Sequence, residues 1–72
     1  MMLNLQRIRK ERGLSQSQLS RLADINVQNI QFYESGQRDI NKAQVNNVYK
    51  LSRALNVKME DIIQVEKLEK RG

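Results

Sequence analysis

The chain has 72 residues with 13 Lys or Arg and 8 Asp or Glu, which gives a formal net charge of +5 at pH 7. A chain this short makes one small domain, and its basic balance is consistent with a polyanionic partner. Because Cys and His are both absent, the sequence excludes disulfides, zinc clusters, thiol nucleophiles and the usual general base.

A recurring pattern of caps and apolar residues predicts five helices and an all-α fold. An apolar residue precedes a capping residue, and a second apolar residue follows five positions after the first, which is the spacing of a hydrophobic staple. The pattern starts at Leu3, Leu14, Ile25, Ile40 and, with a poor cap, Val57. Since Pro is absent and Gly occurs three times, we expect caps rather than helix breakers to separate the helices.

The first two helices are expected at residues 4–12 and 16–23, with Gly13 ending the first. Ser15 and Gln18 form the capping-box pattern at the start of the second helix. We expect the inward-facing side chains of these helices to be Leu3, Leu5, Ile8, Leu19 and Leu22.

A third helix is expected from Val27, after a cap at Asn26, to Ser35, before Gly36. Three residues, Ala23-Asp24-Ile25, remain for the turn between the second and third helices. Two short helices joined by so tight a turn predict a helix-turn-helix unit.

The outer side of this third helix is the main indication of function. At about 100° per residue, one side presents Gln28, Gln31, Phe32 and Ser35, with Val27 at its edge. A solvated helix face would be expected to carry Lys and Glu. Gln amides can instead bond adenine edges, and an apolar ring can meet a thymine methyl. We therefore expect base contacts from Val27, Gln28, Gln31 and Phe32.

The rest of the chain is expected to complete the core. A loop follows Gly36, and a fourth helix is predicted over residues 42–55 with its cap at Asn41. Its apolar stripe, read as core, consists of Val45, Val48, Leu51, Ser52 and Leu55. A fifth helix is predicted near Met59, with Ile62 closing the core. The expected domain spans residues 1–65, followed by a charged, frayed tail at 66–72.

The combined pattern over residues 3–63 resembles the lambda-repressor-like (Cro/Xre) family of helix-turn-helix DNA-binding domains. The resemblance is carried by Ile8-Arg9, Gly13-Leu14-Ser15-Gln16, Leu19, Ile25-Asn26, Ile30, Tyr33-Glu34-Ser35-Gly36, Arg38, the run from Tyr49 to Leu55, and Asp61-Ile62-Ile63. Two features depart from the family. Asp24 stands where Gly is usual, and the loop after Gly36 is longer and lacks the common Pro.

The resemblance implies particular roles for three residues. Arg9 would pair with Glu34 and so hold the first helix against the end of the third. Gln16 would contact the DNA backbone and support a side chain of the third helix, with Gln28 as the expected neighbour. We expect further backbone contacts, together with Gln16, from Ser17, Asn26, Asn29, Ser35, Arg38, Asn41 and Lys42.

The apolar residues near the end of the chain predict a homodimer. They exceed what a short terminal helix needs, and the expected interface consists of Met59, Ile63, Val65 and Leu68. Symmetric pairing would place two reading helices one DNA turn apart, ~34 Å, and match a palindromic operator.

The favoured function is a sequence-specific transcription regulator, more specifically a repressor that occludes a promoter. The alternative is an antitoxin or another regulator of this fold that acts through a protein partner. An enzyme is the weakest hypothesis, because the carboxylates are scattered and no nucleophile has a base beside it. No apolar run approaches the ~18 residues of a membrane span, and no signal-peptide pattern opens the chain. We therefore expect a cytoplasmic protein with no metal, cofactor or small-molecule effector.

Overall fold

The computed structural model describes residues 4–63, and its regular elements are all helical within that range. In chain order they are α1 (Asn4–Glu11), α2 (Gln16–Ala23), α3 (Val27–Ser35), the short 3-10 turn η1 (Ile40–Lys42), α4 (Val45–Leu55) and α5 (Met59–Ile62). The predicted all-α class with five α-helices is confirmed. Leu3, Val65, Leu68 and the predicted tail at residues 66–72 lie outside the described residues.

The helix-turn-helix unit is delimited by the caps that the sequence predicts. At the start of α2, Ser15 Oγ accepts from the Gln18 N–H at 3.0 Å, and Gln18 Oε1 accepts from the Ser15 N–H at 2.8 Å. At the start of α3, Asn26 Oδ1 accepts from the Gln28 N–H at 2.8 Å. Each of these bonds satisfies an N–H group that has no partner within the helix.

Left-handed residues end both helices of the unit. Asp24 has φ 57° and ψ 50° at the end of α2, and Gly36 has φ 85° at the end of α3. Asp adopts this conformation more readily than most residues, which explains how it replaces the usual Gly in the turn.

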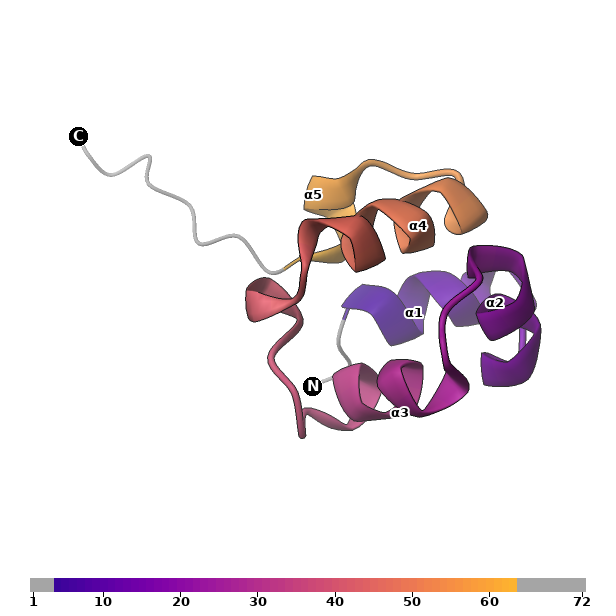
Figure 1. Cartoon of the computed structure of the whole chain (residues 1–72). Coiled ribbons are helices and arrows are strands. Elements are labelled where there is room, and N and C mark those ends of the chain that lie inside the picture. The colour runs from indigo at the N-terminus through magenta and orange to yellow at the C-terminus, as the bar shows by residue number, and fades with distance from the viewer. Residues whose placement is uncertain (1–3, 64–72) are drawn as a thin grey trace.

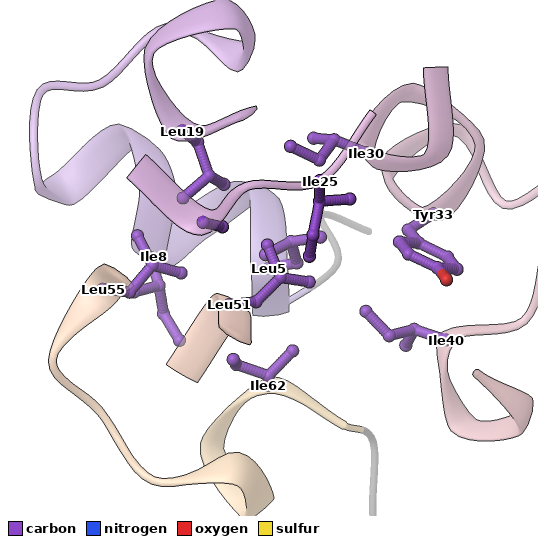
Figure 2. Packing of buried hydrophobic residues seen from close by; sticks show 11 residues of the cluster. Leu5, Ile8, Leu19, Ile25, Ile30, Tyr33, Ile40, Leu51, Leu55 and Ile62 are labelled. Atoms are coloured by element: carbon purple, nitrogen blue, oxygen red, sulfur yellow. The ribbon is translucent and has the colours of Figure 1, made fainter. Parts of the chain in front are cut away.

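Every helix contributes to a single hydrophobic core, shown in Figure 2. The fully buried large side chains are Leu5, Leu19, Ile30, Leu51, Leu55 and Ile62. α4 packs against α2 and α5, while α3 packs against α2 and α1. In Figure 1, α3 lies along one edge of the molecule, with α4 and α5 at the opposite edge. One side of α3 is therefore left without a neighbouring helix.

The predicted start of the fourth helix is wrong. Asn41 does not cap it; instead Asp39 Oδ1 accepts from the Asn41 N–H at 2.9 Å and caps η1. The chain is then extended at Ala43, and α4 begins at Val45 with Gln44 at its N-cap. Ile40 is buried, so η1 takes the orientation that places this side chain in the core.

Two residues predicted to face the core are exposed. Val45, in the first turn of α4, is 73% exposed, although the rest of its stripe is buried. Leu22 in α2 is 61% exposed, because Leu19 and Ala23, one turn apart, supply the buried contacts of this short helix.

The other helices follow the prediction closely. α1 ends at Glu11, one residue before the predicted end, and α5 begins at Met59 as predicted. Among residues 4–63, no helix has the length and apolar character needed to cross a membrane.

Candidate nucleic-acid interface

A buried ion pair holds the C-terminal end of α3 against α1. Arg9 Nε lies 2.6 Å from Glu34 Oε2, and Arg9 Nη2 donates to Glu34 Oε1 at 2.9 Å. The two residues are 7% and 8% exposed. The hydrogen bond to Glu34 raises the pKa of Arg9, and the charge of Glu34 adds to this, while burial opposes it. This forked pair is the one that the family resemblance implies.

Two further bonds extend this cluster to the start of α2. Arg9 Nη1 donates to the Leu14 carbonyl at 2.7 Å, and Gln16 Nε2 donates to Glu34 Oε1 at 2.9 Å. Gln16 thus supports α3 through a hydrogen bond to Glu34. The predicted neighbour of Gln16 was Gln28. The cluster connects α1, the loop after it, α2 and α3, and so fixes the direction of the outer face of α3.

The turn between α2 and α3 is held by contacts to its backbone. Ser20 Oγ donates to the Ile25 carbonyl, and the Ile25 N–H donates to the Ser20 carbonyl at 3.1 Å. Lys50 Nζ of α4 lies 3.5 Å from the Asp24 carbonyl. The angle between the two helices is thereby set by polar contacts as well as by the core.

The outer face of α3 is polar but uncharged. Gln28 and Gln31 are exposed, and Val27 is half-buried at the edge of the face. The charged residue of α3 is Glu34, and it is buried in the ion pair. The exposed amides of Gln28 and Gln31 can therefore donate and accept hydrogen bonds on a face of α3 that carries no charged side chain of this helix.

Arg38, in the loop after α3, contacts the side chains of both Phe32 and Asn29. The Arg38 guanidinium carbon is 4.9 Å from the centre of the Phe32 ring, and Arg38 Nη1 donates to Asn29 Oδ1 at 3.1 Å. The Arg38 N–H also donates to the Phe32 carbonyl at 3.1 Å. Sequence reasoning placed Arg38 among the backbone contacts, whereas the fold joins it to the side chains of α3.

An open polar hollow lies beside α3, between η1 and the start of α4. Its lining residues are Asn29, Tyr33, Arg38, Asp39, Lys42, Ala43, Gln44 and Asn47. Sequence reasoning missed Gln44 and Asn47, because it began the fourth helix too early. Asn47 Nδ2 lies 3.4 Å from the Tyr33 hydroxyl. The sequence does contain a pattern that predicts the later start of this helix. Asp39 stands two residues before Asn41, and an Asp side chain at this spacing can cap a local turn.

The remaining predicted contact residues belong to α2, to the N-cap and last turn of α3, and to η1. The exposed ones are Ser17, Asn26, Ser35, Asn41 and Lys42. Of the predicted dimer interface, Met59 and Ile63 are half-buried, and the other two residues lie outside the described range.

The comparison with protein families agrees with this geometry. A family profile described as "Helix-turn-helix" matches residues 5–62, which is most of the chain. The comparison with curated proteins gave no significant match. With α2, the turn and α3 arranged as described, the chain belongs to the Cro/C1-type helix-turn-helix family of DNA-binding domains.

Proposed function

We propose that this protein is a sequence-specific transcription regulator that places α3 in the major groove of double-stranded DNA. Binding over a promoter would block transcription directly, so the protein would act as a repressor. The family supplies the DNA-binding class. The operator readout and the repression are our own inference.

The observation that carries the proposal is the uncharged, amide-bearing outer face of α3. Gln28 and Gln31 are exposed there, on a helix whose opposite side is fixed by the core and by the buried ion pair. The major groove admits a helix, and a Gln amide matches the N6 and N7 atoms of adenine. The anchored helix would hold these amides in one register along the base edges.

Contacts to phosphates would position the domain on either side of this face. Gln16 and Ser17 lie in the first turn of α2, where the helix dipole favours a phosphate. Asn26, Asn29, Ser35, Asn41 and Lys42 would make the remaining contacts. Such contacts strengthen binding without reading the sequence.

We further propose that the protein binds a palindromic operator as a homodimer. Met59 and Ile63 are half-buried apolar residues of the C-terminal part that the structure describes, and Val65 and Leu68 would extend the same interface. Sedimentation would test this: a monomer at micromolar concentration, with no cooperativity on a palindrome, would contradict the dimer.

Selection of bound sites from random duplex DNA tests the main proposal. Wild-type protein should select a defined motif, and Gln28→Ala should relax the preference at one or two base pairs by ~1–3 kcal/mol. Gln6→Ala is the matched control, since it removes the same amide from α1 and should leave the motif unchanged. If Gln28→Ala lowers the affinity for every sequence equally, Gln28 does not read bases.

A further inference from the structure

Arg38 is tied to the outer face of α3 by two different contacts. Its guanidinium lies over the Phe32 ring at 4.9 Å, and Nη1 donates to Asn29 Oδ1 at 3.1 Å. A cation over an aromatic face and a hydrogen bond to an amide both favour this one placement. The side chain is thus directed along α3, although Arg38 itself belongs to the loop that follows.

Most of the hydrogen-bonding capacity of Arg38 remains available. A guanidinium has five N–H donors in a planar fork, and one of them is used by Asn29 among the residues that the structure describes. Arg38 is exposed, so the unused donors can reach a ligand. They are presented beside Phe32, on the same side of the helix as Gln28.

We propose that Arg38 reads a guanine in the major groove, and that Phe32 and Asn29 are its positioning residues. The inference rests on the proposed function of α3. Guanine presents two acceptors, O6 and N7, which match the fork of an Arg side chain. Since Phe32 lies next to the fork, its ring would meet the methyl group of a thymine adjacent to that guanine.

The alternative role for Arg38 is a phosphate contact. A comparison with Lys42 shows how a phosphate contact differs from a base contact. Lys42 is an exposed cation of η1, and neither a ring contact nor an ion pair ties it to α3 in the described part of the chain. A phosphate can be bound by a point charge, which a flexible Lys supplies, whereas the two acceptors of guanine need an oriented pair of donors. Stacking on a ring and bonding to an amide orient the guanidinium plane, which matters for a planar acceptor pair.

The test uses the DNA motif that wild-type protein selects, together with duplexes changed at single base pairs. Competition binding then compares the base preferences of wild type with those of Arg38→Lys, Arg38→Ala and Lys42→Ala. Arg38→Lys keeps the charge, and we expect it to lose the guanine preference by roughly 5- to 150-fold with an unchanged salt dependence. Arg38→Ala should lose the same preference. Lys42→Ala should weaken all duplexes alike and reduce the salt slope by about one unit.

Two further measurements separate reading from positioning. Replacing the selected guanine by 7-deazaguanine, which lacks the N7 acceptor, should weaken wild-type binding and leave Arg38→Ala unaffected. Phe32→Leu keeps an apolar contact but removes the ring, so it should reduce the guanine preference without changing the salt slope. Because Arg38 is exposed, all its variants should retain the helical circular dichroism of the wild type.

The results also distinguish the two proposals. If wild-type protein selects no motif, the proposed function of α3 fails. If it selects a motif whose guanine preference survives Arg38→Lys, and Arg38→Ala lowers the salt slope instead, Arg38 contacts a phosphate and this inference alone is overturned.

Discussion

Glu34→Gln should be far more destabilising than its small change in shape suggests. Glu34 accepts two hydrogen bonds from Arg9 and one from Gln16, and both members of the ion pair are more than nine-tenths buried. The amide keeps the size of the side chain but leaves the guanidinium of Arg9 buried without a counter-charge. Removing one partner of a buried pair costs ~3–5 kcal/mol.

That cost is large for a domain of this size. Typical stabilities per residue imply a free energy of unfolding of about 4–11 kcal/mol for this chain. The expected fall in melting temperature is at least about 12 °C, since each 1 kcal/mol shifts a small domain by ~4–8 °C. Urea unfolding followed by far-ultraviolet circular dichroism would measure the loss as a lower midpoint with an unchanged slope.

Glu11→Gln is the matched control, because it makes the same change in a surface pair. Arg7 Nη1 lies 3.2 Å from Glu11 Oε2, with both side chains about half exposed, and such a pair contributes only ~0.2–1 kcal/mol. Equal losses in the two variants would refute the role given to the buried pair. If Glu34→Gln does not fold, Arg9→Met combined with Glu34→Leu should recover much of the stability, because neither charge is then left unpaired.

Two further changes test the helix-turn-helix unit itself. Asn26→Ala should lower the free energy of unfolding by ~1 kcal/mol, because the cap bond to the Gln28 N–H is lost; an unchanged melting temperature would contradict this. Asp24→Gly should be at least as stable as wild type, whereas Asp24→Val should be less stable by about 1–2 kcal/mol, because φ is 57° in this turn. Thermal melts that rank Val level with Asp would show that the turn is not held in the left-handed conformation.

The elements of the reading unit could be predicted because their signals are local. Ser15 and Asn26 each bond an N–H two or three residues further along the chain, so their effect does not depend on distant neighbours. The same holds for the ends of the helices at Asp24 and Gly36. The outer face of α3 then follows from helical spacing once its start is known.

The start of the fourth helix was placed wrongly because two local patterns compete there. Ile40, Asn41 and Val45 have the spacing of a staple, but Asp39 caps a shorter turn there. Sequence alone does not say which of the two caps prevails. In the folded domain Ile40 is buried in the core while Val45 faces solvent, so the two do not form the predicted staple. Because the fourth helix was predicted to start too early, the positions of Gln44 and Asn47 in the hollow beside α3 were not predicted.

Composition and short-range patterning were thus sufficient for the helical class, the position of the helix-turn-helix unit and the uncharged face of α3. Those properties depend on bonds and spacings within about one helical turn. The exposure of Leu22 and Val45 and the bond from Gln16 to Glu34 depend on which helices come together in space. The placement of Arg38 over Phe32 depends on how the loop after α3 turns back along that helix. Gln16 and Glu34 are 18 residues apart and meet only after the core has packed. The loop after Gly36 has no regular spacing, so the direction of Arg38 became visible only in the folded domain.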